Sequence, residues 1–209
     1  MLETVLASIR WLGHDGFILT IGGKTVVFDP FGAAHTEKAD IILISHEHFD
    51  HCSPDDAAKF TGPDTVIVTE PVSAAKLSGD VRTMKPGDTV TVAGVEISAV
   101  PAYNIGKPFH PKSNRWLGFV VAADNVAVYH AGDTDLIPEM AEIRCDIACV
   151  PVSGTYVMTW EEAVEAVKRI RPKVAIPMHY GGIVGTAADA ESFRKALEGV
   201  CRVEIPRPA

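Results

Sequence analysis

The sequence has few cysteines and few basic residues. Its four cysteines form no CxxC pair, and a chain of 209 residues can bury a core that needs no disulfide staples. A reducing, cytoplasmic setting is therefore expected. Its 19 Lys and Arg residues are outnumbered by 27 Asp and Glu residues, which leaves a formal net charge of −8. Because nucleic-acid binding needs a basic surface, general binding to DNA or RNA is not expected.

Long hydrophobic runs are also missing. The longest uncharged apolar stretches, such as 41–44, are the size of a strand, whereas a membrane span needs about 20 apolar residues. The first five residues lack the basic start and apolar stretch of a signal peptide. Neither membrane insertion nor export is therefore expected. A hydrophobic content of 47% with 22% charged residues is typical of a globular domain.

Short runs of β-branched and aromatic residues alternate with segments of helical pattern. Strands are expected at 17–21, 25–28, 39–45, 66–69, 89–92, 95–100, 117–122, 126–130, 146–150, 174–177 and 202–205. Helices are expected from Ser53 onward and at 71–77, 159–170 and 189–197, with a long loop at 101–116. This order predicts one domain over residues 1–209. Two sheets would pack face to face with helices outside, a four-layer α/β/β/α sandwich.

Residues 46–51 concentrate side chains that bind metals. They read His-Glu-His-Phe-Asp-His and directly follow the apolar run 39–45, which is typical of a strand buried on both faces. Because side chains alternate along an extended chain, His46 and His48 lie on the same side and can reach one ion. Asp50 and His51 follow where the chain leaves the strand and can turn toward a second ion. Imidazole and carboxylate ligands favour zinc, with Mn, Fe, Co and Ni as alternatives.

Together with Gly132-Asp133-Thr134 and Pro177-Met178-His179-Tyr180, this segment resembles the metallo-β-lactamase superfamily. The motifs occur in the family's order over essentially the whole chain. Trp11-Leu12-Gly13-His14 and Phe28-Asp29-Pro30 are most similar to one branch. That branch contains ascorbate-6-phosphate lactonase and the N-acyl-phosphatidylethanolamine phospholipase D type enzymes. The resemblance implies the four-layer fold and a metal-dependent hydrolase.

The resemblance also implies two divalent ions, zinc above all, held by six side chains. His46 and His48 would hold the first ion, Asp50, His51 and His179 the second, and Asp133 would bridge both. Asp133 and His179 each follow an expected strand. The ligands are therefore expected at the C-terminal ends of strands, where they can converge on one edge.

One position departs from the family pattern. A third histidine for the first ion usually follows the strand that ends near Val100, and in this chain Asn104 stands there. Asn is a poor zinc ligand because it offers a neutral oxygen. His110 lies further along the same loop and could bend back as a ligand or contact the substrate.

Several other residues have expected roles near the ligands. His14 matches a position close to the metals in the resembling branch, so it is a candidate for contact with a ligand or the substrate. Asp29 is expected to orient a ligand imidazole through its free N–H. His130 ends an expected buried strand and would hydrogen-bond a backbone carbonyl or a ligand carboxylate. Cys52 is expected to be a packed, neutral thiol.

Two divalent ions that share a water supply hydroxide near neutral pH. We therefore expect metal-bound hydroxide to hydrolyse an ester, lactone, amide or phosphodiester bond of a small molecule, with Asp50 as the catalytic residue that orients the hydroxide. Lys107, Lys112 and Arg115 in the 101–116 loop suggest an anionic substrate, although a solvated basic loop is the alternative.

A second hypothesis is a non-catalytic metal-binding or scaffold protein on the same fold. It arises because Asn104 would leave the first metal site weak. The resembling branch also contains homo-oligomers, so a homo-oligomer is a further expectation, which rests on analogy alone.

Overall fold

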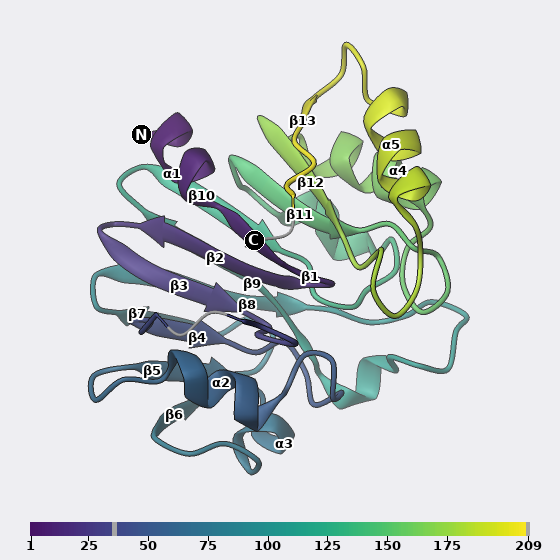
Figure 1. Cartoon of the computed structure of the whole chain (residues 1–209). Coiled ribbons are helices and arrows are strands. Elements are labelled where there is room, and N and C mark those ends of the chain that lie inside the picture. The colour runs from purple at the N-terminus through teal and green to yellow at the C-terminus, as the bar shows by residue number, and fades with distance from the viewer. Residues whose placement is uncertain (35–36, 208–209) are drawn as a thin grey trace.

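The computed structural model describes residues 1–34 and 37–207, so His35, to which the sequence assigns no role, lies outside the described residues. Two sheets stand face to face within this part of the chain (Figure 1). The first contains, in spatial order, β1 (Arg10–Gly13), β2 (Gly16–Ile21), β3 (Lys24–Phe28), β4 (Ile41–Leu43), β5 (Val66–Thr69) and β6 (Asp80–Thr83). The second contains, also in spatial order, β7 (Thr89–Val92), β8 (Val95–Pro101), β9 (Leu117–Ala123), β10 (Val126–His130), β11 (Ile147–Pro151), β12 (Val174–Met178) and β13 (Arg202–Val203).

Helices cover the outer faces of the two sheets, which confirms the predicted α/β/β/α sandwich. They are α2 (Pro54–Phe60), α3 (Pro71–Ala74), α4 (Trp160–Ile170) and α5 (Ala187–Ala196). Helix α1 (Leu2–Ser8) instead packs against β2 and places Val5 in the large core, and two 3-10 turns are η1 (Lys112–Asn114) and η2 (Pro138–Glu142). In Figure 1, α2 and α3 lie beside the first sheet, and α4 and α5 beside the second. Among the described residues, no helix combines the length and apolar character that crossing a bilayer requires.

Each sheet begins antiparallel and ends parallel. Strands β1 to β3 and β7 to β10 form antiparallel meanders, whereas β3 to β6 and β10 to β13 run parallel. Parallel neighbours place their carboxyl ends at one edge of the sheet. The loops after β4, β10 and β12 therefore leave the sandwich at strand ends, where ligands of such sheets are usually bound.

Strand β4 shows why its sequence is apolar without alternation. Ile41 and Leu43 face the large core between the sheets, while Ile42 and Ile44 face a smaller core under α2 that includes Phe60. A strand buried on both faces needs apolar residues at every position. Cys52 is also buried in the smaller core, and burial raises the pKa of its thiol, as expected of a packed, neutral residue.

Helix α4 begins as its sequence predicts. The Thr159 hydroxyl accepts from the Glu162 backbone N–H, and the Glu162 carboxylate accepts from the Thr159 N–H, which completes a capping box. The sequence does not predict α1 or β6. Strand β6 is an edge strand with one apolar residue, Val81, and mostly exposed side chains. Its sequence therefore lacks the alternation of apolar and polar residues that would predict a strand.

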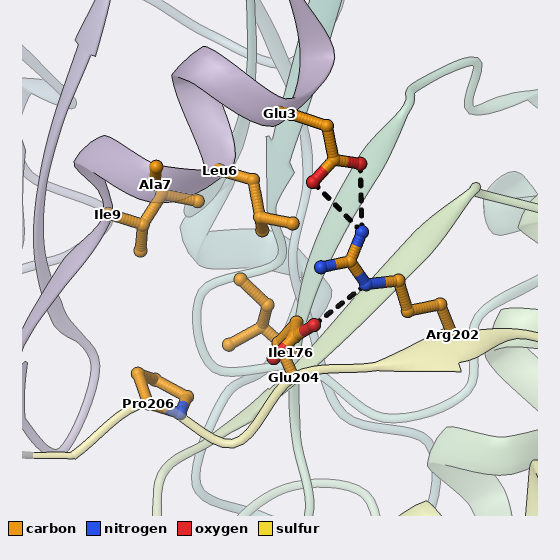
Figure 2. A pocket seen from close by; sticks show the side chains of 8 residues that line it. All are labelled: Glu3, Leu6, Ala7, Ile9, Ile176, Arg202, Glu204 and Pro206. Atoms are coloured by element: carbon orange, nitrogen blue, oxygen red, sulfur yellow. Dashed lines mark hydrogen bonds and ion pairs between the residues drawn. The ribbon is translucent and has the colours of Figure 1, made fainter.

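The two ends of the described chain meet beside β12. Arg202 of β13 donates to both carboxylate oxygens of Glu3 on α1, at 2.8 and 3.0 Å, and also to Glu204. Figure 2 shows the guanidinium between the two acids, at the side of a hollow of about 290 Å³ that Leu6 and Ile176 also line. Because the charged groups of this hollow bind one another, they position α1 against the C-terminal segment.

Candidate metal centre

The predicted ligands come together at one edge of the sandwich. Residues 46–51 follow β4, Asp133 follows β10, and His179 directly follows β12. His14 lies in the turn between β1 and β2, and its carbonyl accepts a hydrogen bond from the His179 backbone N–H at 3.1 Å. Segments more than 100 residues apart in the chain are thereby joined at the same place.

One group of three histidines forms the first candidate ion position. His46, His48 and His110 each offer a ring nitrogen, and these nitrogens all lie within 4.8 Å of one another. The His46 Nε2 and His48 Nδ1 atoms are 3.0 Å apart. The Trp116 ring packs against both, with ring centroids 4.7 Å from each. The sequence leaves open whether Asn104 or His110 takes the third position, and in the structure His110 is the residue that joins this group.

Asn104 lies beside this group and holds His110. Its Oδ1 accepts from the His110 backbone N–H at 2.9 Å and lies 3.1 Å from His110 Nδ1. Its Nδ2 donates to the Tyr156 carbonyl at 2.9 Å. With Nδ1 engaged in this way, the Nε2 atom of His110 points to the remaining ligands. Asn104 therefore holds His110 through hydrogen bonds, and His110 is the candidate for the third ligand of the first ion.

A second group surrounds Asp133. One ligand atom each from Asp15, His51, Asp133 and His179 lies within 4.8 Å of the others. Asp133 Oδ1 is 3.4 Å from His51 Nε2, and Asp133 Oδ2 is 3.2 Å from His179 Nε2. Asp133 Oδ2 is also 3.0 Å from His110 Nε2 of the first group. Asp133 thus lies between the two groups, as expected of a bridging carboxylate.

Asp50 is set slightly apart from both groups. Its Oδ2 accepts from His14 Nε2 at 3.1 Å and lies 3.9 Å from His51 Nε2. Among the described residues, Asp50 is not a member of any group of three or four candidate ligands. The sequence predicts Asp50 as a ligand of the second ion, and with its Oδ2 3.9 Å from His51 Nε2 this role stays a prediction. His14 forms a further group with His51 and His179, which agrees with its expected place near the ligands.

Asp15 is the candidate ligand that the sequence does not reveal. It is 0% exposed, and neither carboxylate oxygen has a hydrogen-bond partner in the part of the chain that the structure describes. In the sequence it stands in a Gly-His-Asp-Gly turn, where an Asp is ordinarily a turn former. Its burial depends on the packing of the β1–β2 turn against the end of β12, and the residues around Asp15 in the sequence do not predict that packing.

Polar side chains behind the ligands fix their orientation. His51 Nδ1 donates to Asp29 Oδ2 at 2.9 Å, so Asp29 orients a ligand imidazole as expected. The backbone N–H and hydroxyl of Ser45 also donate to Asp29, at 2.7 and 2.6 Å. His130 Nε2 lies 2.8 Å from the Asp15 carbonyl, the kind of backbone contact predicted for it. Such contacts set the tautomer and direction of ligating histidines.

The backbone is strained where the site is built. His14, Asp29 and His179 have φ values of 50°, 38° and 59°, in the left-handed region that L-residues seldom adopt. Each such residue costs about 1–3 kcal/mol and persists only where the surroundings hold it. Here the hydrogen bonds of Asp29 and the link between His14 and His179 supply that support.

The buried carboxylates of the site attract positive charge. Burial by itself raises the pKa of Asp133, but His179 and His51 outweigh it and hold this pKa well below its usual range. Burial by itself lowers the pKa of His179, but Asp133 and Asp15 raise it to about 9. Burial likewise lowers the pKa of His51, and Asp133 and Asp29 raise it well above its ordinary value.

Several buried atoms of the site lack partners within the described residues. They include His51 Nε2, His110 Nε2 and Asp133 Oδ1. Buried polar atoms are seldom left unpaired, because the loss of hydration is then uncompensated. These atoms are also the ones that converge on the two candidate positions. Imidazole nitrogens and carboxylate oxygens at this spacing suit divalent zinc, manganese, iron or cobalt, so the residues present fit a metal centre.

The fold and the shared carboxylate define a domain of the metallo-β-lactamase superfamily, and residues 8–179 match the β-lactamase superfamily domain. The chain belongs to the family of UPF0173 metal-dependent hydrolases. The member from Methanopyrus kandleri is 34% identical over 209 residues and covers 91% of each chain. The member from Archaeoglobus fulgidus is 34% identical over 212 residues, which cover 91% of this chain and 90% of that protein.

Two solved structures are also similar. A crystal structure from Parabacteroides distasonis has a TM-score of 0.85 at 36% identity and covers 95% of this chain and 91% of its own. Igni18, described as a metallo hydrolase of Ignicoccus hospitalis, has a TM-score of 0.80 at 26% identity, covering 96% and 95%. The likeness to the finer branch that contains ascorbate-6-phosphate lactonase stays a prediction.

Proposed function

We propose that this chain hydrolyses an ester, lactone or phosphodiester bond of a small molecule and uses two divalent ions, zinc above all. One observation carries the proposal. Asp133 reaches His110 of one histidine group and both His51 and His179 of the other, over 3.0–3.4 Å. A carboxylate between two sets of imidazoles is suited to two ions that share it and hold the reacting groups between them.

Divalent ions bound at these ligands would lower the pKa of a water and polarise the bond to be cleaved. The chain's own contribution falls to Asp50. Its carboxylate lines the pocket in front of the ligands and is 14% exposed, while His14 fixes its orientation. From this place Asp50 would accept a proton from the attacking water and return it to the leaving group. His46, His48 and His110 would bind the first ion, and Asp50, His51 and His179 the second, with Asp133 shared by both and Asp15 as a further candidate ligand of the second.

The likeness of 11–14 and 28–30 to the lactonase and phospholipase D type branch supports the choice of ester-like and phosphodiester bonds. The alternative of a non-catalytic scaffold arose from the missing third histidine at Asn104. Because His110 completes the first group, that reason no longer favours the scaffold. We retain the cytoplasmic setting as a proposal, based on four free cysteines among the described residues.

Metal analysis and hydrolysis assays on matched variants test this function. The metal-loaded protein should contain two ions per chain and hydrolyse at least one of a panel of p-nitrophenyl esters, lactones and bis-p-nitrophenyl phosphate. His48→Ala and Asp133→Asn should abolish turnover while the far-ultraviolet circular dichroism is unchanged. Glu47→Gln is the matched control, because Glu47 lies between two ligands in sequence but pairs with Lys76 at 3.0 Å. Full activity of either ligand variant would refute the assignment.

A further inference from the structure

The mouth of the metal centre is apolar. A pocket of about 270 Å³ opens in front of the ligands, and half of its lining consists of the ligand candidates and Asp50. The other half consists of Phe49, Phe109, Tyr156 and Ile183. Phe49, Phe109 and Ile183 are 68%, 43% and 44% exposed, which is unusual for large apolar side chains gathered at one place.

These apolar side chains come from four separate segments of the chain. Phe49 lies within the 46–51 motif and packs edge-on against Phe31, with ring centroids 5.7 Å apart. Phe109 packs edge-on against Tyr156 at 4.7 Å. Ile183 belongs to the loop after β12. An apolar rim that several loops assemble around polar ligands is the usual construction of a small-molecule site, in which apolar contacts bind and a few polar groups orient.

The basic residues of the 101–116 loop do not serve this pocket. Lys107 donates to Asp135 and to the Val157 carbonyl, both at 2.6 Å. Lys112 donates to Glu139 at 2.9 Å and lies 3.1 Å from the Tyr103 hydroxyl. Among the described residues, no lysine or arginine lines the pocket. Apart from the proposed ions, a carboxylate or phosphate group in this pocket would therefore lack the charged side-chain donors that usually recognise it.

We infer that the substrate is an uncharged ester or lactone with an aromatic or branched apolar group next to the cleaved bond. This inference rests on the proposed function and narrows it. The pocket volume lies near the lower end of the ~300–1,000 Å³ of small-molecule sites, which suits a group of about one ring. The expectation of an anionic substrate, drawn from the loop's basic residues, is accordingly replaced by a neutral, apolar one.

Two esters with the same leaving group test the inference. p-Nitrophenyl 3-phenylpropanoate carries a neutral aromatic acyl group, and mono-p-nitrophenyl succinate carries an anionic acyl group of similar length. After correction for their alkaline hydrolysis rates, kcat/KM of the metal-loaded protein should favour the phenylpropanoate by about 10-fold or more. Phe109→Ala and Ile183→Ala should each reduce this ratio. Val72→Ala, an exposed apolar residue of α3 outside the pocket, is the matched control and should preserve it.

Three results would overturn the inference. They are a corrected ratio near one, a preference for the succinate, or an unchanged ratio in both rim variants. The last result, together with a change from dimer to monomer in the rim variants, would identify the rim as a contact between copies of the chain.

If neither ester is hydrolysed, the proposed function fails for these bonds. A binding experiment then tests whether the apolar rim, formed by Phe49, Phe109, Tyr156 and Ile183, prefers a neutral ligand. Saturation-transfer NMR should then detect the neutral ketone 4-phenyl-2-butanone but not levulinate, and Phe109→Ala should weaken the ketone signal. Binding of levulinate alone would refute the apolar assignment.

Discussion

Substitution of Asn104 tests how the first ion position is built. In Asn104→Ala, the His110 backbone N–H and the Tyr156 carbonyl each lose a partner at 2.9 Å, and His110 Nδ1 loses a contact at 3.1 Å. At about 1 kcal/mol for each neutral hydrogen bond, the free energy of unfolding should fall by about 2–3 kcal/mol. The His110 ring then keeps only the contact of its Nδ1 with the Tyr156 carbonyl, at 3.2 Å, so it is held less firmly. Loss of a group that orients a ligand typically weakens metal binding by about 10- to 100-fold.

The assay compares three variants by zinc competition with a chromophoric chelator and by thermal unfolding in EDTA. Asn104→Ala should bind two ions, one of them more weakly than in the unchanged protein. His110→Ala should lose one ion, because it removes a ligand. Asn104→Asp keeps the acceptor oxygen for the His110 N–H and should lie between the unchanged protein and Asn104→Ala. The reasoning is refuted if Asn104→Ala binds both ions with full affinity, or if Asn104→Ala loses an ion that His110→Ala retains.

Three further predictions concern the buried Asp15, the close backbone contact at Gly132, and the ion pair of Asp146 with Lys173 away from the site. Asp15→Asn should weaken binding of one ion, because it removes a buried carboxylate oxygen that lies with the ligand atoms of His51, Asp133 and His179; metal titration measures the effect. Gly132→Ala should destabilise the protein by about 2 kcal/mol or more and weaken metal binding, since φ is +60° and a Cβ would meet the Leu117 carbonyl oxygen at 2.7 Å. Asp146→Asn should lower the free energy of unfolding by about 1–2 kcal/mol at pH 7. Burial by itself raises the pKa of Asp146, but hydrogen bonds from Lys173 and the Ala127 N–H outweigh burial and lower this pKa. The difference in free energy of unfolding between the unchanged protein and Asp146→Asn should therefore shrink as the pH falls below about 4, as urea titrations would measure.

Each of these predictions has a control within the chain. Gly23→Ala shares a positive φ, of +70°, but has no atom within 4 Å of the added Cβ, so it should cost less than Gly132→Ala; equal costs would exclude the close contact as the cause. Asp15→Asn would contradict its assignment if both ions bound normally. A difference between Asp146→Asn and the unchanged protein that grows toward acid pH would reverse the expected sign.

Much of the architecture could be predicted because its signals are local. The Thr159 and Glu162 capping box lies within one turn of helix, and the apolar run before His46 needs only its own residues to indicate a doubly buried strand. The spacing of His46 and His48 likewise follows from the alternation of side chains along the chain. Helix α1 and strand β6 were not predicted, because their short segments gain stability mainly from the sheets that they join.

The sequence by itself determined the sandwich, the metal-binding motif and the neighbourhood of Asp133 and His179. Only the tertiary structure decided that His110 joins His46 and His48, that Asn104 hydrogen-bonds His110, and that His14 contacts Asp50. The tertiary structure also decided that Asp15 is buried with no hydrogen-bond partner among the described residues. It also decided that Lys107 and Lys112 are already paired, which leaves the pocket apolar. Each of these outcomes depends on which loops meet where the two sheets pack, and contacts between residues far apart in a chain leave no periodic trace in its sequence.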